Sequence, residues 1–314
     1  MEFSSPIVFE PLFMERVWGG RRLESFPGKR LPQSSRIGES WEIVDREEAQ
    51  SVVHDGPFRG VTLHELWTER RAEVFGEGLP DSPRFPVLCK LLDAQERLSV
   101  QVHPSPLTAA KYGGECKSEV WYVMDALLDS DLYAGLKRGV TRDSFEDALR
   151  NGKVADQVFE MPVKKGDAIF IPSGRVHAIG AGNVIAEIQQ NSDTTYRVFD
   201  WNRIGFDGRP RDLHIEESLA SINFEDIEPK KIDPGSGDVL VACEFFRVER
   251  WSLTGPRAAS DDRRFSIFTV VEGSVECGGR SFSVGSFFLV PPRMQPGEIA
   301  PREGSAAVLR TTIP

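Results

Sequence analysis

Residues Gly166–Pro172 read GDAIFIP, and residues Gly285–Pro291 read GSFFLVP. Both stretches consist of a glycine, five residues with an apolar centre, and a proline. A turn residue followed by a short run of β-branched or aromatic residues is typical of a β-strand. Two such stretches in one chain predict a duplicated β unit, with one copy in each half of the protein.

Turn residues divide the whole sequence and indicate a mainly β fold. The chain contains 28 glycines and 21 prolines, with aromatic or β-branched runs between them. This texture predicts many short strands joined by tight turns, as in a barrel or a sandwich. Together with the repeat, it leads us to expect two β-barrels of one type.

Three segments carry helical signals instead. Thr62–Gly76 opens with the pattern of a capping box and is expected to end at its glycine. Thr141–Gly152 has a threonine cap and acidic residues in its first turn. A third candidate begins at Asp212. These helices would decorate a protein that is mostly β.

The length of 314 residues suits two compact units or one large decorated unit. Around residues 230–238 the sequence is polar and rich in proline and glycine, as linkers are. We therefore expect a catalytic, metal-binding domain with helical decoration at residues 1–232. Residues 233–314 would form a smaller β domain, a degenerate copy without the metal ligands.

The composition argues against several classes of partner. A formal net charge of −10 disfavours a general nucleic-acid-binding or anionic-membrane surface. No apolar run approaches the roughly 18–20 residues that cross a bilayer, and no basic segment followed by an apolar run opens the chain. The four cysteines form no C-x-x-C pair, which favours reduced thiols. We expect a cytoplasmic protein without nucleic-acid or membrane partners.

Polar side chains that suit a metal or a charged ligand recur on two predicted strands of the first half. Side chains two residues apart on a strand point to the same face. In LSVQVHP, from Leu98, this rule groups Ser99, Gln101 and His103. In KSEVWYV it groups Lys117, Glu119 and Trp121. An amide, an imidazole and a carboxylate therefore occupy positions where a buried β face is normally apolar.

His177 follows Pro172 by five residues, whereas Pro296 stands at the same offset in the second copy. Only the first barrel would then have a polar interior. We expect four side chains to converge there on one metal ion: Gln101, His103, Glu119 and His177. Two imidazoles, a carboxylate and an amide oxygen suit Zn²⁺, although Fe²⁺, Mn²⁺ or Co²⁺ accept the same ligands. The alternative is that a buried histidine is a satisfied core residue, which we expect of His54, His64 and His214.

The pattern G-x5-P-x-G-x2-H, which ends at His177, resembles the second motif of the cupin superfamily. Further segments resemble, in the same order, the short bacterial form of the type I mannose-6-phosphate isomerases. They are WGG from Trp18, GESWEI from Gly38, RFPVLCKLLDA from Arg84, LSVQVHP from Leu98, KSEVWYV from Lys117, IPSGRVHAIGAG from Ile171 and EIQQNSDTTYRVFDWNR from Glu187. The resemblance covers roughly the first two thirds of the chain. The C-terminal third resembles the family only in texture.

The resemblance implies a double cupin, that is, two jelly-roll β-barrels with added helices. It implies an aldose–ketose isomerase that interconverts mannose 6-phosphate and fructose 6-phosphate through a cis-enediol or enediolate, with one Zn²⁺ per chain. The family's metal-ligand positions fall on Gln101, His103, Glu119 and His177. Arg197 matches an arginine near the reacting carbons or the phosphate, and Ser99 matches a serine implicated in phosphate contact. Lys117 and Glu187 match further polar positions of the family's cleft.

The chemistry explains these residue types. Moving a carbonyl between neighbouring carbons requires a base for the carbon-bound proton and positive charge beside the enediolate. Glu187 is our candidate base, with a metal-bound hydroxide or a histidine as rivals, and Arg197 or Lys117 would add positive potential. Arg197 has the alternative of pairing with Asp193 or Asp200. We expect Trp18 and Trp121 to be wall or core residues.

Two other functions remain open at the level of the sequence. One is a metal cupin of another class, such as an iron dioxygenase, which would consume oxygen. The other is a sugar-binding cupin with a structural metal, which would bind its ligand without turnover. Lys117, Arg197 and Ser99 suit a phosphorylated sugar better than oxygen chemistry, because an acidic protein needs local positive charge to hold a phosphate dianion. The resemblance implies that this sugar is a hexose 6-phosphate. The oligomeric state and the preferred hexose phosphate do not follow from the sequence.

Overall fold

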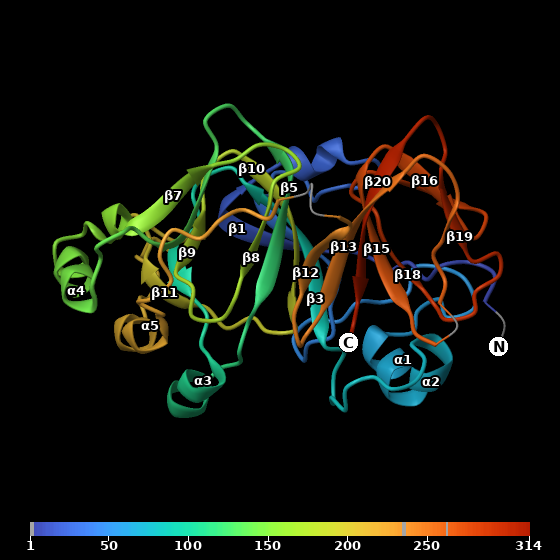
Figure 1. The fold of residues 1–314 in the computed structure, drawn as a ribbon, viewed down its shortest axis with the longest axis horizontal. Helices are drawn as coiled ribbons and strands as arrows, with labels where there is room; N and C mark the ends of the chain where they lie inside the picture. The colour runs from blue at the N-terminus through green and yellow to red at the C-terminus, as the bar shows by residue number, and fades with distance from the viewer. Residues whose placement is uncertain (1–2, 234–236, 262) are drawn as a thin grey trace.

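The computed structural model describes residues 3–233, 237–261 and 263–314. The chain is mainly β, as the sequence predicts, with four sheets and short helices (Figure 1). Strands up to Phe199 form one pair of sheets, and strands from Val239 onward form the other. In Figure 1 the two pairs lie side by side, the C-terminal pair in orange to red.

The larger N-terminal sheet has six strands and carries much of the polar cavity described below. Its order is β1 (Leu12–Gly20), β2 (Ile37–Ile43), β3 (Val87–Ala94), β10 (Asn183–Gln190), β5 (Glu119–Ala126) and β8 (Ala168–Ile171). All neighbouring pairs are antiparallel. Strand β3 is buried along its whole length, because both faces of this sheet are covered.

The second N-terminal sheet has five strands. Its order is β11 (Tyr196–Phe199), β4 (Val100–Val102), β9 (His177–Ile179), β6 (Asp131–Leu136) and β7 (Val158–Pro162). The two sheets pack through one apolar cluster that draws side chains from both, among them Leu92, Trp121, Ile185, Leu132 and Ile179. Such face-to-face packing forms a sandwich whose interior is lined by alternate residues of each strand.

The C-terminal half also consists of two sheets. One has the order β12 (Val239–Ala242), β13 (Arg247–Leu253), β20 (Ala306–Thr312), β15 (Ser266–Glu272) and β18 (Phe287–Val290). The other has the order β14 (Arg257–Ala258), β19 (Glu298–Pro301), β16 (Ser274–Cys277) and β17 (Arg280–Ser283).

The two halves repeat one topology, which confirms the duplication predicted from the sequence. The order β3-β10-β5-β8 recurs as β13-β20-β15-β18, and β4-β9-β6-β7 recurs as β14-β19-β16-β17. The two copies of the sequence repeat lead into the equivalent strands β8 and β18. Their first residues, Gly166 and Gly285, have φ of 92° and 84°, a region that glycine adopts readily.

The helices are shorter than the sequence pattern suggests. The segment predicted as one helix to Gly76 is two, α1 (Leu63–Glu69) and α2 (Arg71–Val74), because Arg70 leaves the helical region with φ −125° and ψ 22°. The capping box of Thr62 with Glu65 is confirmed.

The second predicted helix is confirmed as α4 (Arg142–Arg150) with its Thr141 cap. The third, α5 (Ile215–Ser221), begins after His214, later than the predicted start. The helix α3 (Pro106–Tyr112) was not predicted; Ser105 accepts a hydrogen bond from the Thr108 N–H, and a proline occupies the first turn. The described residues also contain two 3₁₀ turns, η1 (Arg22–Ser25) and η2 (Val154–Gln157).

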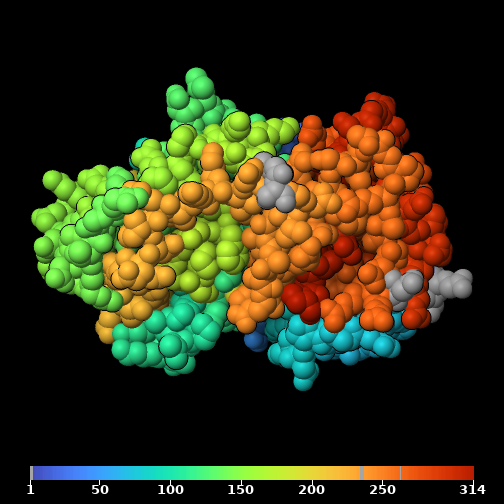
Figure 2. Space-filling model, in the orientation of Figure 1, coloured from blue at the N-terminus to red at the C-terminus, as the bar shows by residue number. Residues whose placement is uncertain are grey.

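The two halves share a hydrophobic core. Trp67, Phe75 and Phe85, from helices α1 and α2 and the loop after them, pack around Phe265 of the C-terminal half. The ring centroids of Phe75 and Phe265 are 5.2 Å apart. Figure 2 shows the cyan surface of this helical region against the orange C-terminal half. The predicted linker at residues 230–238 includes residues 234–236, which lie outside the described residues.

All four cysteines are free thiols, in agreement with the prediction. Within the described part of the chain, no helix combines the length and the apolar character that a membrane crossing requires.

Candidate metal centre and surrounding cavity

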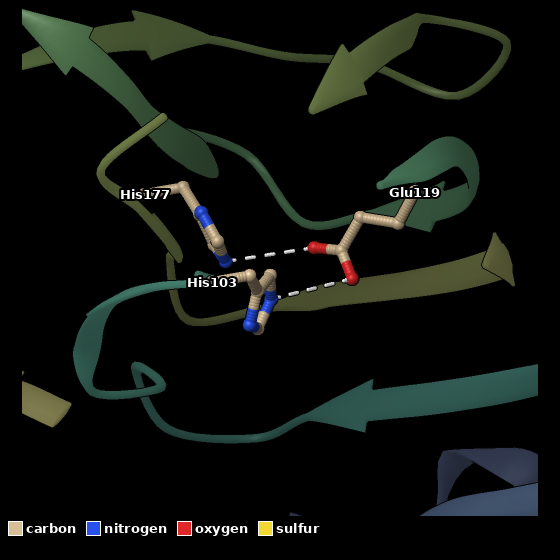
Figure 3. Close-up of side chains that lie close together, drawn as sticks. All are labelled: His103, Glu119 and His177. Atoms are coloured by element: carbon tan, nitrogen blue, oxygen red, sulfur yellow. Dashed lines mark ion pairs between the residues drawn. The ribbon is translucent and has the colours of Figure 1, made fainter. Parts of the chain in front are cut away.

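Three metal-binding side chains meet inside the N-terminal sandwich. His103 directly follows β4, Glu119 begins β5 and His177 begins β9, so residues distant in the sequence are brought together by strands of both sheets. Figure 3 shows the three side chains pointing toward one another. All three are fully buried. Among the described residues, this is the one group that offers three histidine, cysteine or carboxylate donors within 4.8 Å of one another.

The separations match those of atoms that share one metal ion. Nε2 of His103 lies 3.6 Å from Oε2 of Glu119, and Nε2 of His177 lies 3.5 Å from Oε1 of Glu119. Ligand atoms about 2.1 Å from a tetrahedral zinc ion lie roughly 3.4 Å from each other. Each histidine nitrogen is therefore near ligand spacing from one of the two Glu119 oxygens, and one atom from each of the three residues lies within 4.8 Å of the others.

Both imidazoles are held with Nε2 facing the centre. Nδ1 of His103 lies 2.9 Å from the carbonyl oxygen of Thr194, and Nδ1 of His177 lies 2.8 Å from that of Arg175. A carbonyl accepts only from a protonated nitrogen, so Nδ1 carries the proton and Nε2 keeps its lone pair. This outer contact is the arrangement that fixes metal-binding histidines.

Electrostatics keeps the three donors in the states that metal binding requires. Burial lowers the pKa of His177 to about 3, and burial with the Lys117 charge also lowers the pKa of His103. Burial opposes ionisation of Glu119, but Lys117 and the two histidines outweigh it and hold the pKa of that carboxyl well below its ordinary value. Both imidazoles are thus neutral and the carboxylate is ionised near neutral pH.

Gln101 is the fourth predicted ligand, and the structure brings it to the same centre. It pairs with His177 across β4 and β9, and its Nε2 lies 3.2 Å from Nε2 of His177. Ligation by Gln101 requires the amide to turn by 180°, so that Oε1 faces the ion. Nε2 of His103 and Oε1 of Glu119 are buried atoms without a hydrogen-bond partner among the described residues. Both atoms carry lone pairs, and a buried acceptor without a partner is costly, so a bound cation would satisfy them.

A cavity of about 430 Å³ opens beside these donors. It is lined by residues of both N-terminal sheets and of the loops beside them: Arg16, Trp18, Glu39, Lys90, Leu92, Leu98, Ser99, Gln101, Lys117, Trp121, Ile179, Glu187, Asp193, Thr195, Arg197 and Arg211. All the predicted substrate-contacting and catalytic residues, namely Ser99, Lys117, Glu187 and Arg197, are therefore on its wall. Trp18 and Trp121 line it too, in agreement with the wall role expected of them.

Glu187 lies between two buried lysines. Its Oε1 is 3.0 Å from Nζ of Lys90 and 3.7 Å from Nζ of Lys117, and its Oε2 accepts a hydrogen bond of 2.9 Å from Nε1 of Trp121. Burial and the Glu119 charge raise the pKa of Glu187 in spite of the lysines. A buried carboxylate with a raised pKa is a stronger base than an exposed one.

Arg197 does not form the ion pair that the sequence left open. Asp200 instead accepts two hydrogen bonds from Arg211, at 2.8 and 2.6 Å. Nη1 of Arg197 donates to the carbonyl oxygen of Asp212 at 2.8 Å, and its Nε is buried without a partner among the described residues. Burial and the neighbouring Arg211 charge lower the pKa of the Arg197 guanidinium. Among the described residues Arg197 forms no ion pair within 4 Å, although the charges of Asp200 and Asp212 act on it from farther away.

Residues 8–125 match the family model described as phosphomannose isomerase type I, catalytic domain. The mannose-6-phosphate isomerase ManA of Bacillus subtilis is 37% identical over 278 residues, which span 86% of this chain and 86% of that protein. The chain belongs to the type I phosphomannose isomerase family. A crystal structure of the mannose 6-phosphate isomerase from Bacillus subtilis shares this family fold, with 30% identity and a TM-score of 0.86 over 98% of this chain and 100% of that one. A mannose 6-phosphate isomerase structure bound with zinc and yttrium, 16% identical, has the same fold with a TM-score of 0.74 over 98% of this chain and 99% of that one.

Four charged residues that line the cavity were not identified from the sequence: Arg16, Glu39, Lys90 and Arg211. Glu39 and Lys90 are charged residues inside the buried strands β2 and β3. A charged residue within an apolar strand could have indicated a site, because such residues are rarely buried without a partner. Arg211 is in an irregular segment and gave no signal.

Two expectations from the sequence need correction. Lys117 precedes β5 rather than lying on it, although its ammonium still reaches Glu119 at 2.9 Å. The three histidines expected in the core are not buried there: His54 is exposed, and His64 and His214 are half-buried. His64 lies against Asp45, and Nδ1 of His214 accepts a hydrogen bond from the Arg197 N–H.

Proposed function

We propose that this protein interconverts mannose 6-phosphate and fructose 6-phosphate through a cis-enediol or enediolate, with Zn²⁺ as its cofactor. Membership of the type I phosphomannose isomerase family supports the reaction, since its relative from Bacillus subtilis carries that activity in its name. The observation that carries the proposal is the buried group of His103, Glu119 and His177 at metal-ligand spacing beside a charged cavity.

The proposed metal ligands are Gln101, His103, Glu119 and His177. The choice of Zn²⁺ rests on this donor set of imidazoles, a carboxylate and an amide oxygen, and on the zinc in the solved structure of a protein with the same fold. When bound, a divalent ion polarises the sugar carbonyl and stabilises negative charge on the enediolate oxygens.

The proton transfer is assigned to Glu187. Its carboxylate would take the proton from C2 of the open-chain aldose and return it to C1. A second proton would pass from O2 to O1, so that the C1 aldehyde becomes a hydroxymethyl group and C2 becomes the ketone. The raised pKa of Glu187 brings the carboxyl closer to neutral pH and strengthens it as a base. The ammonium groups of Lys90 and Lys117 flank this carboxylate and would stabilise charge that develops on the sugar oxygens.

The phosphate is assigned to the part of the cavity lined by Arg197 and Arg211, with Ser99 as a further donor. Arg197 has a buried Nε without a partner among the described residues. A guanidinium binds phosphate oxygens through two parallel hydrogen bonds, so this free edge suits the dianion. The cavity of about 430 Å³ lies within the range of roughly 300–1,000 Å³ that is usual for small-molecule sites.

Other expectations from the sequence are kept as predictions. They are the cytoplasmic location, the absence of nucleic-acid and membrane partners, and the division into a catalytic domain at residues 1–232 and a C-terminal domain at 233–314. The last of these needs a qualification, since the two halves share the aromatic core around Phe265.

The proposal is tested with the purified protein in a coupled assay of fructose 6-phosphate conversion, combined with metal analysis. We expect one zinc ion per chain, loss of turnover on chelation and recovery when Zn²⁺ is restored. His177→Ala should contain no metal and have no turnover, whereas His64→Ala, a control at a histidine outside the cavity, should keep both. Full turnover after chelation would contradict the metal role. Oxygen consumption would point to a dioxygenase, and saturable sugar binding without turnover would point to a binding protein.

A further inference from the structure

Charges of opposite sign alternate from the metal donors to the far part of the cavity wall. Each member of the series contacts the next at 2.9 to 3.9 Å, in the order Glu119, Lys117, Glu187, Lys90, Glu39 and Arg16. The last five of these line the cavity. The roles proposed above use the series only as far as Lys90, and they leave Glu39 without a function.

The Glu39 carboxylate is held in place by three hydrogen bonds from neighbouring side chains. It is buried on β2 at 7% exposure. Its two carboxylate oxygens accept hydrogen bonds of 3.0 and 3.1 Å from Nε and Nη2 of Arg16, and Oε2 also accepts one of 2.6 Å from Nε1 of Trp41. Although burial opposes ionisation, Lys90 and Arg16 lower the pKa of Glu39 to about 2. A permanent negative charge therefore stands at one defined place in the wall.

The group that depends on this charge is the Lys90 ammonium. Lys90 is buried at 4% exposure, and an ammonium taken out of water needs opposite charges close by. Nζ lies 3.0 Å from Glu187 and 3.9 Å from Glu39. Burial alone would lower the pKa of Lys90, but Glu187, Glu39, Asp193 and Glu119 together hold it above its ordinary value. Glu39 is the only one of these carboxylates that is anchored by partners outside the metal and base region, namely Arg16 and Trp41.

We propose that Glu39 is a positioning residue of the isomerase: anchored by Arg16 and Trp41, its carboxylate holds the Lys90 ammonium charged and in place beside the Glu187 base. This inference rests on the proposed function. It predicts that loss of the Glu39 charge lowers turnover rather than substrate binding, because Lys90 and Glu187 act on the reacting carbons and not on the phosphate.

The same strand offers a matched control. Glu42 is also on β2, is buried at 6% exposure, and is paired with the ammonium of Lys29. Glu42 does not line the cavity. Replacement of either glutamate by glutamine therefore breaks a buried ion pair of β2, but only the change at position 39 alters the surroundings of Lys90.

The test compares Glu39→Gln, Glu39→Asp and Glu42→Gln in the full-length, zinc-loaded protein, by kcat, KM, the pH dependence of kcat and the thermal midpoint. We expect Glu39→Gln to lower kcat about tenfold or more, as loss of one charged contact implies, with KM nearly unchanged. The alkaline limb of its kcat profile should move to lower pH, because Lys90 loses its proton more easily, and Glu39→Asp should restore part of kcat. Glu42→Gln should lower the thermal midpoint and leave kcat and the alkaline limb as in the wild type.

Arg16→Gln serves as a second variant in case Glu39→Gln does not fold, because Arg16 is only partly buried and anchors Glu39. It should change kcat and the alkaline limb in the same direction by a smaller amount. Equal kcat and an equal alkaline limb in Glu39→Gln and Glu42→Gln would overturn the inference. An inactive wild-type protein would instead contradict the proposed function, so the two failures are distinguishable.

Discussion

Replacement of Arg197 is the perturbation that best separates a substrate-binding arginine from a structural one. In Arg197→Ala the backbone contacts of residue 197 are retained, and its N–H still reaches Nδ1 of His214 at 3.1 Å. The change removes the guanidinium, whose Nη1 donates to the Asp212 carbonyl and whose Nε is buried without a partner among the described residues. No carboxylate of the described chain is left unpaired by the loss.

The magnitude follows from the hydrogen bonds that one guanidinium edge can form. A hydrogen bond to a charged group contributes about 1.5–3 kcal/mol, so two bonds to a phosphate dianion contribute about 3–6 kcal/mol. This corresponds to a loss of roughly 10²- to 10⁴-fold in kcat/KM. Arg197→Lys should recover a minor part, because an ammonium keeps the charge but not the two parallel donors.

The assay is steady-state conversion of the hexose 6-phosphate, with inorganic phosphate as a competitive inhibitor. Arg197→Ala should show the loss in kcat/KM together with weaker inhibition by phosphate. Arg209→Ala is the matched control, since Arg209 is an exposed arginine of the same segment and does not line the cavity. A kcat/KM of Arg197→Ala within twofold of the wild type would refute the reasoning and leave Arg197 a structural residue.

Three further predictions concern the metal, the pH dependence of stability and the shared core. Glu119→Gln should lose zinc and turnover, because it removes the one charged ligand and leaves Lys117 without its closest carboxylate. Metal analysis of the folded variant checks this prediction, and a full zinc content would contradict it. Burial and the Glu160 carboxyl raise the pKa of Asp131 from its ordinary value of 3.8 to about 6. Ionised Asp131 therefore destabilises the folded protein above pH 6, and this destabilisation fades as the pH falls from 6 toward 3.8. Asp131→Asn should therefore raise the thermal midpoint at pH 8, with a gain that shrinks below pH 6; an equal gain at pH 4 and pH 8 would argue against this origin. Phe265→Ala should cost about 3–5 kcal/mol of unfolding free energy and leave the zinc content of the folded protein unchanged, as chemical denaturation and metal analysis would test.

The sequence predicted the side chains that meet at the metal centre, because their signals are local. Polar residues in alternation on a strand face, and a histidine at a fixed offset from a glycine turn, identify side chains that point inward. Gln101, His103, Glu119 and His177 carry such signals, and the structure brings all four together. The duplication was also readable, because Gly166 and Gly285 occupy equivalent turns.

The remaining features depend on contacts between distant segments. Arg211 reaches the cavity only because the segment that follows β11 folds back and pairs Arg211 with Asp200. The break between α1 and α2 at Arg70 lies between Trp67 and Phe75, which pack against each other. Phe75 in turn packs against the distant Phe265, a contact that no local pattern encodes. Glu39 and Lys90 could have been suspected as charged residues within apolar strands, but their mutual contact required the register of β2 on β3.

The most direct test of the central claim is anomalous diffraction at the zinc edge from crystals of the zinc-loaded protein. The account predicts one peak per chain, about 2.0–2.2 Å from Nε2 of His103, Nε2 of His177 and a carboxylate oxygen of Glu119, with Oε1 of Gln101 turned toward it. A peak bound by other residues, or no peak between these side chains in an active protein, would contradict the account.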